Sequence, residues 1–147
     1  MAFSDQQARV LVHCTTAANA VSPAIDDVQI AFPVPRGRCV RVFWTAEEDP
    51  ELIPDTLTED IVAEVIHVSA FWPLSNIGET DAADYATQVY AFKHALRTAI
   101  DGDTKLNTHA KHVAMRNAEL TYAQIAGAEF LVVDVDIAIE STTYTLV

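Results

Sequence analysis

Apolar positions along the chain repeat with a helical period in two segments. In the first, Leu11, Cys14, Ala18 and Val21 are three or four positions apart, and Pro23 follows them, which predicts a helix over residues 4–20. The second segment, 81–101, begins with acids, carries Lys93 and Arg97 toward its end, and is followed by Gly102. That polarity suits the helix dipole and a glycine cap, so a second helix is expected there. Its apolar stripe is Tyr85, Val89, Phe92, Leu96 and Ile100.

Five other segments are β-branched or alternate with a period of two, which is typical of strands. They are residues 28–32, 39–45, 61–71, 118–125 and 130–139, and the last two are joined by Ala126-Gly127-Ala128, which suggests a hairpin. Residues 103–117 fit neither period. The predicted fold is a single α+β domain over 1–147, with a mostly antiparallel or mixed sheet and two helices packed on one face. The other face is left for water or a partner.

The segment 46–60 contains two prolines and many acids, so we expect a long exposed loop. Two interpretations remain open: the loop is mobile until a neighbouring subunit orders it, or it folds back on its own subunit.

The stretch "VVDVDIAIE" and the leucine before it place Asp134, Asp136 and Glu140 on one face of the last strand. On the other face lie Leu131, Val133, Val135, Ile137 and Ile139. This alternation fits a sheet that is buried on one side. A hard-cation site would need further acids or a glycine-bearing loop near these carboxylates. We therefore expect a water-facing acidic surface with no bound metal.

Other motifs do not indicate catalysis. His109 and His112 lack the companion ligands of a zinc site, and His67, within a strand, is expected to be hydrogen-bonded in the fold rather than catalytic. The chain has no Gly-x-Ser-x-Gly elbow and no phosphate-binding glycine loop, and Cys14 and Cys39 are expected to be buried thiols. No enzyme activity, cofactor or metal is predicted.

The net charge of −12 excludes tight binding to DNA or to anionic membranes, because both need cations. No secretory signal and no apolar run long enough for a spanning helix is present, so a cytosolic origin is expected. The basic cluster of Arg36, Arg38 and Arg41 has several interpretations. These residues are solvated, form ion pairs within the subunit, pair with acids of a neighbouring subunit, or touch phosphate.

The order and length of these elements resemble the tail terminator proteins of long-tailed bacteriophages. The resemblance is carried by the opening helix, "FPVPRGR" before a strand, the long acidic loop, the helix at 81–101 and the alternating last strand with its "ESTTYT" tail. It implies a non-enzymatic virion protein, assembled in the host cytoplasm, that forms a homo-oligomeric ring, usually a hexamer. Such a ring caps the tail tube protein and joins it to the head-completion proteins of the neck, with DNA only in transit.

Under this resemblance, Asp134, Asp136, Glu140, Arg36, Arg38 and Arg41 are expected at the lumen or at a subunit interface, since an acidic lumen would let DNA pass by repulsion. Three alternatives stay open: another small neck or tail-tube protein, a non-viral oligomeric adaptor, and a small enzyme.

Overall fold

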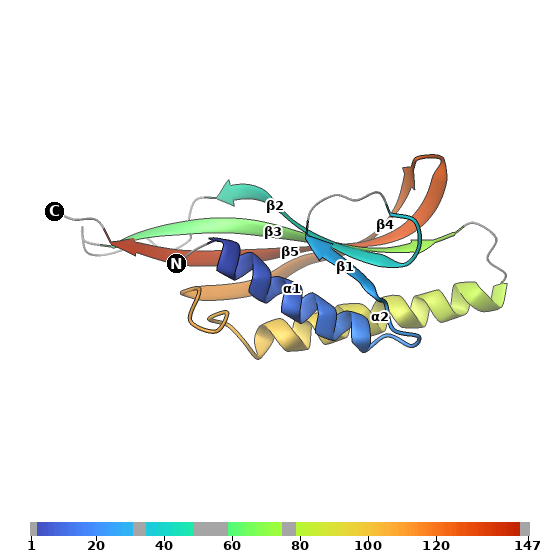
Figure 1. Ribbon diagram of the computed structural model, residues 1–147, viewed down its shortest axis with the longest axis horizontal. Helices are drawn as coiled ribbons and strands as arrows, with labels where there is room; N and C mark the ends of the chain where they lie inside the picture. Colours follow the sequence, from blue (N-terminus) through green and yellow to red (C-terminus); the bar gives the residue numbers. More distant parts are fainter. Residues whose placement is uncertain (1–2, 31–34, 49–58, 75–78, 145–147) are drawn as a thin grey trace.

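The computed structural model describes residues 3–30, 35–48, 59–74 and 79–144, and these ranges contain two helices and one sheet. The elements in chain order are α1 (Phe3–Asn19), β1 (Asp27–Ile30), β2 (Cys39–Glu48), β3 (Glu59–Pro73), α2 (Glu79–Asp101), β4 (His112–Ile125) and β5 (Ala128–Tyr144). The predicted α+β class is confirmed (Figure 1).

The sheet has the strand order β1-β2-β3-β5-β4, with β1 parallel to β2 and every other pair antiparallel. Its centre is the pairing of the two longest strands, β3 and β5, which runs from Glu59 opposite Tyr144 to Pro73 opposite Phe130. The short β1 and the long β4 form the two edges.

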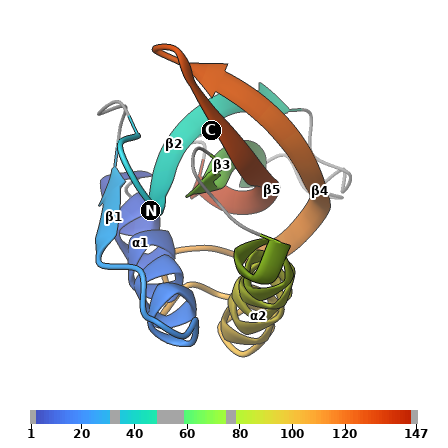
Figure 2. The same cartoon turned by 90° about the vertical axis from the view of Figure 1, so that its right-hand side faces the viewer.

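Both helices lie on one side of the curved sheet, as expected (Figure 2). The main core fills the space between them, and its largest side chains are Trp72 from β3 and Phe92 from α2, whose rings meet edge to face at 6.2 Å between centroids. Val133, Val135, Ile137 and Ile139 all point into this core, so the predicted alternation of β5 is confirmed.

A second, smaller core lies on the opposite face of the sheet. Its buried members are Cys39, Phe71, Phe130 and Val132, and the Phe71 and Phe130 rings meet edge to face at 5.9 Å between centroids. Ala123, Ile125 and Ala128, around the turn of the β4–β5 hairpin, pack against it, and Figure 2 shows this hairpin curling over the side away from the helices. The expectation that this whole face is open is therefore wrong at this end of the sheet, because the chain covers it with its own hairpin.

The segment between α2 and β4 is a turn that is tied to α1. Leu106, Asn107 and Thr108 all have positive φ, and Leu106 is fully buried in the main core. Asp103 accepts hydrogen bonds from the Asn107 backbone N–H and from Arg9 of α1, at 2.8 Å each. A left-handed backbone is costly for non-glycine residues, so these contacts hold the turn in place.

Some predicted boundaries were wrong. β2 continues through the bulge between Trp44 and Ala46 to Glu48, and β3 already begins at Glu59, so both ends of the predicted loop 46–60 are strand. Residues 49–58 of the predicted loop lie outside the described residues, and so does the prediction that the loop is mobile or folded back. The unassigned segment 103–117 is a turn followed by the first half of β4. Neither α1 nor α2 combines the length and apolar character of a membrane-spanning helix.

Candidate functional site

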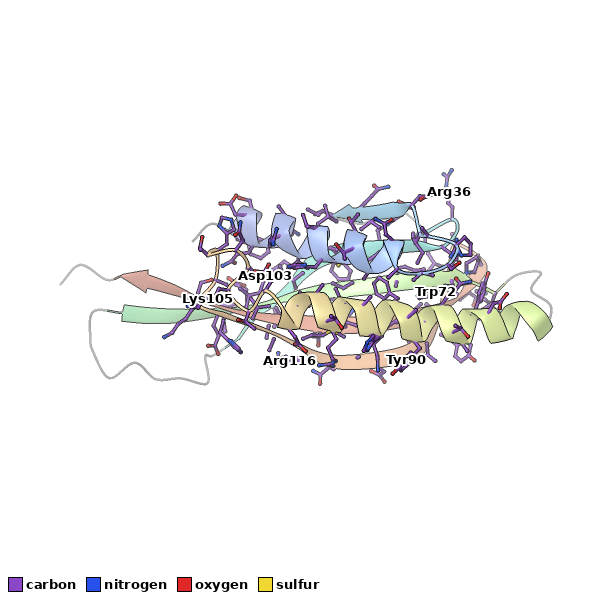
Figure 3. All side chains as sticks on the ribbon, turned by 90° about the horizontal axis from the view of Figure 1, so that it is seen from below. Arg36, Trp72, Tyr90, Asp103, Lys105 and Arg116 are labelled. Atoms are coloured by element: carbon purple, nitrogen blue, oxygen red, sulfur yellow. The ribbon has the colours of Figure 1, made fainter. Side chains whose placement is uncertain are left out.

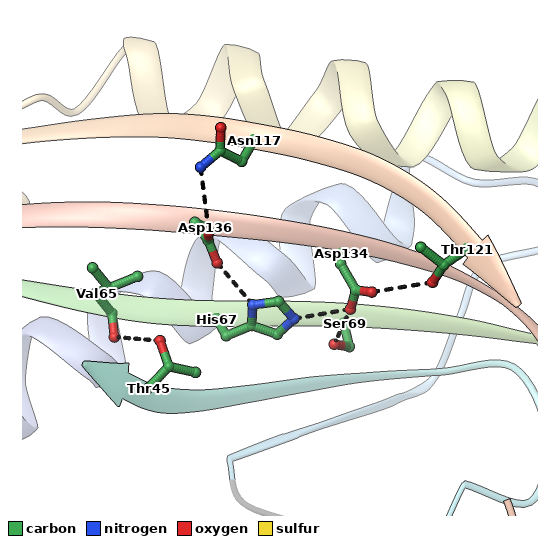
Figure 4. A network of polar contacts seen from close by, with 8 residues as sticks. All are labelled: Thr45, Val65, His67, Ser69, Asn117, Thr121, Asp134 and Asp136. Carbon is green, nitrogen blue, oxygen red and sulfur yellow. Dashed lines mark hydrogen bonds and ion pairs between the residues drawn. The ribbon is translucent and has the colours of Figure 1, made fainter. Parts of the chain in front are cut away.

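A polar cluster lies on the sheet face opposite the helices, where β3 and β5 pair. The register sets His67 opposite Asp136, and Ser69 opposite Asp134. His67 lies between the two carboxylates: its Nδ1 is 2.8 Å from Asp136 Oδ1, and its Nε2 is 2.8 Å from Asp134 Oδ1 (Figure 4). The Ser69 hydroxyl donates to the same Asp134 oxygen at 2.7 Å. The predicted hydrogen bonding of His67 within the fold is confirmed.

The edge strand β4 adds two further donors. Thr121 Oγ1 donates to Asp134 Oδ2 at 3.2 Å, and Asn117 Nδ2 makes a long contact of 3.5 Å with Asp136 Oδ2. The β4–β5 register shifts between Arg116 and Glu119, and Asn117 within this bulge has φ of 53°. A bulge re-aims side chains along a strand, which here brings Asn117 toward Asp136.

The cluster is partly shielded from solvent, with side-chain exposures of 20% for His67, 30% for Asp134 and 29% for Asp136. Burial alone would raise the pKa of Asp134, but hydrogen bonds from Ser69, His67 and Thr121 and the charge of His67 outweigh it. They hold this pKa below its ordinary value. An ionised carboxylate only accepts hydrogen bonds, so a ring nitrogen of His67 that binds Asp134 does so by donating.

An open cavity of about 530 Å³ lies over the cluster, lined by His67, Asn117, Ala118, Glu119, Asp134 and Asp136. The Phe43 ring lies on β2 beside His67, with 5.1 Å between ring centroids. Both ring nitrogens of His67 lie 2.8 Å from a carboxylate oxygen, so the histidine could reach another group only by breaking one of these two contacts. The arrangement is a pair of carboxylates on the open face of the sheet, both held by side chains of β3 and β4.

The other predicted site residues do not join this cluster. Glu140 shares the strand face of Asp134 and Asp136 but lies four positions along β5 from Asp136, opposite Ala63 and His112. It is partly buried.

The predicted basic cluster is split. Arg36 is exposed, whereas Arg38 donates from Nη1 to the Pro23 carbonyl and to Gln88 Oε1, at 2.7 and 2.9 Å. Arg41 is buried and binds both carboxylate oxygens of Asp27, at 3.0 and 2.9 Å, which lowers the pKa of Asp27. Arg41 thus takes the intramolecular ion-pair role that the sequence allowed, whereas Arg38 is held within the subunit by neutral acceptors.

His67, Ser69, Thr121 and Asn117 are the members of the cluster that sequence reasoning did not connect to Asp134 and Asp136. The period of two places His67 and Ser69 on one strand face, but it does not give the register between β3 and β5. His109 lies in the turn and His112 opens β4, so the two do not share a helix. Across the described side chains, no group of three or more His, Cys, Asp or Glu residues is arranged to hold a metal ion.

Comparison with known proteins adds little. No protein-family model matches the chain, and no curated protein matches it either. Several solved structures match, and one of them, whose name states no function, matches over 100% of this chain and 98% of its own, with 14% identity and a TM-score of 0.41. A likeness at that level carries no argument about function.

Proposed function

We propose that this protein is a structural subunit of a bacteriophage tail, a tail terminator that forms a homo-oligomeric ring on the tail tube and joins it to the neck. One observation carries the proposal: the cleft on the face away from the helices displays the carboxylates of Asp134 and Asp136, and hydrogen bonds keep Asp134 ionised there. The order of the elements, which resembles that family, supports it.

An acidic surface has a specific use in such a ring. DNA carries dense negative charge, and a channel wall of cations would hold its phosphates, whereas carboxylates repel them. If the cleft faces the lumen, Asp134 and Asp136 keep the passage free of bound DNA. His67 of β3 then has a structural role, since its ring lies between the two carboxylates of β5 and contacts both.

The first test is the mass of the assembly and its position. Sedimentation over a concentration series should give a closed multimer, near six subunits, and electron micrographs should show it at one end of uncapped tail tubes. A chain that stays monomeric in solution and leaves the tubes bare would refute the proposal.

The second test concerns the lumen. We expect rings carrying Asp136→Lys to retain double-stranded DNA in a filter-binding assay that wild-type rings do not, because the substitution turns a repelling group into a phosphate-binding one. Glu129→Lys, in the exposed part of the β4–β5 hairpin, makes the same charge change away from the cleft. Equal retention by both variants would show that the cleft does not line the passage.

A further inference from the structure

His67 lies between two carboxylates, and its contacts with them set the number of protons that the three groups hold. Each ring nitrogen is 2.8 Å from a carboxylate oxygen, Nε2 from that of Asp134 and Nδ1 from that of Asp136. Two contacts of this length need two hydrogens, because a lone pair that faces a carboxylate oxygen makes no hydrogen bond. A neutral imidazole carries only one hydrogen on nitrogen. The second hydrogen is therefore an additional proton, held on the ring or on the Asp136 carboxyl.

Asp134 is held firmly on the sheet. Its Oδ1 also accepts the Ser69 hydroxyl at 2.7 Å, and its Oδ2 accepts Thr121 Oγ1 at 3.2 Å. Burial raises the pKa of Asp134, but the hydrogen bonds from Ser69, His67 and Thr121 and the charge of His67 outweigh it and lower this pKa. Asp134 is therefore the ionised partner that accepts from His67 Nε2, and two other donors keep it in place.

Asp136 is held less firmly. Its Oδ2 lies 3.5 Å from Asn117 Nδ2, which is long for a hydrogen bond. Asn117 is an exposed residue of the β4 bulge. When His67 Nδ1 carries no hydrogen and Asp136 is ionised, two acceptors face each other at 2.8 Å, and this arrangement is unfavourable. Asp136 is then the carboxylate that turns away, because its remaining contact is the weaker one.

Other charged side chains near the ring come from the neighbouring strands, since both helices lie on the opposite side of the sheet (Figure 2). On β4, Arg116 (Figure 3) is opposite Asp136 in the register, and Glu119 lines the cavity over the cluster. On β2, Arg41 is engaged with Asp27 of β1. The residue of β2 directly opposite His67 is the uncharged Phe43. The two groups that touch the ring nitrogens are thus the carboxylates of β5.

We propose that His67, Asp134 and Asp136 form a pH-dependent switch. With the additional proton, the ring holds both carboxylates. Without it, the ring keeps its Nε2–H contact with Asp134 and releases Asp136 into the cavity. The three groups carry a net charge of −1 with this proton and −2 without it, so the cleft becomes more negative as the pH rises. The change is a property of the single chain and does not depend on a ring.

NMR of the labelled wild-type protein from about pH 5 to about pH 9 tests the switch, because histidine titrates within this range. At the acid end, we expect a hydrogen on His67 Nε2 and a second one on Nδ1 or on the Asp136 carboxyl. As the pH rises, the second hydrogen should be lost. The signals of the Asp136 carboxyl carbon and of the Asn117 side-chain amide should shift with the same midpoint, since Asp136 leaves its position.

His13 is an internal reference in the same spectra. Its Nε2 lies 2.6 Å from one carboxylate, that of Asp103, on the helix side of the sheet (Figure 3). A neutral ring keeps this contact by donating from Nε2, so no additional proton is required. His13 should therefore keep its Nε2–H and its contact with Asp103 when the ring becomes neutral.

Two variants separate the contact from the general charge of the cavity. The amide of Asp136→Asn can donate to Nδ1 of a neutral ring, so the additional proton is no longer needed. This variant should lose the second ring N–H at a lower pH than the wild type does. Glu119→Gln is the matched control, because it removes an exposed carboxylate that lines the same cavity from a position opposite Asp134 on β4. It should titrate almost as the wild type does.

Several results would overturn the switch. One is a wild-type ring with a single N–H beside an ionised Asp136 at every pH, since the second contact would then contain no hydrogen. Another is a second hydrogen that stays in place up to about pH 9. A third is loss of that hydrogen without any change at Asp136 or Asn117. Equal midpoint shifts in Asp136→Asn and Glu119→Gln would also count against it, because the charge of the cavity would then control the titration.

Discussion

Asp103 should stabilise the fold in a way that depends on pH. Its Oδ2 lies 2.8 Å from Arg9 Nε and 2.6 Å from His13 Nε2, and its Oδ1 accepts from the Asn107 backbone at 2.8 Å. Burial would raise the pKa of this carboxyl, but the hydrogen bonds from Arg9, Asn107 and His13 and the charge of Arg9 outweigh it and lower the pKa from 3.8 to about 2. The contact joins α1 to the turn after α2.

The size of the effect follows from this shift. One pKa unit corresponds to about 1.4 kcal/mol, so the full shift would correspond to about 2.5 kcal/mol. The Arg9 side chain is 34% exposed, and solvent screens part of its charge, so we expect about 1–2 kcal/mol for Asp103→Asn at pH 7. For a chain of this length, that loss lowers the melting temperature by about 3–7 °C.

The sign of the pH dependence is fixed by the direction of the shift. A carboxyl with a lowered folded-state pKa adds stability above its unfolded pKa and loses it as the pH falls through the folded value. The free energy of urea unfolding should therefore be larger for the wild type than for Asp103→Asn at pH 7. The difference should disappear between about pH 4 and pH 2. The control is Asp101→Asn, which changes an exposed carboxyl at the last residue of α2, two positions before Asp103. Its free energy of unfolding should match that of the wild type at every pH. A gap that persists at pH 2, or none at pH 7, would refute this reasoning.

Two further predictions concern the core and the polar cluster. Leu96→Ala, at a fully buried position of α2, should lower the free energy of urea unfolding by about 2–5 kcal/mol. Tyr90→Ala, at an exposed position of the same helix, should lower it by under about 1 kcal/mol. Similar losses in the two variants would contradict the assignment of the buried stripe. Asp134 and Asp136 should bind no calcium, magnesium or manganese in calorimetric titration, because their oxygens already accept from His67, Ser69 and Thr121, and micromolar binding abolished by Asp136→Ala would disprove this.

The sequence pattern predicted the elements better than the contacts between them. The stripe from Phe92 to Ile100 and the alternation of β5 mark buried faces directly, because burial of one face imposes a period on the chain. The pairing of His67 with Asp136 depends on the register of two strands far apart in the sequence, and no local pattern encodes it. The ion pair of Arg41 with Asp27 likewise requires the parallel contact of β1 and β2.

The hairpin that curls over the far face was also beyond local patterns. Phe130 and Val132 follow the same strand parity as Asp134 and Asp136, so period alone assigns them to the water-facing side. They are buried because the chain bends back over them, and a bend of this kind is set by sheet twist and by the β4 bulge rather than by hydrophobic spacing.

The central β3–β5 pairing has a consequence for synthesis of the chain. β3 ends at Pro73 and its partner begins at Ala128, 55 positions later. At translation rates of about 5–20 residues per second, β3 is complete about 3–11 s before synthesis of β5 begins. During this time one edge of a 15-residue strand offers unpaired N–H and C=O groups to other nascent chains. Chaperone binding and early aggregation should therefore concentrate on the β2–β3 half of the nascent chain and cease once β5 has been made.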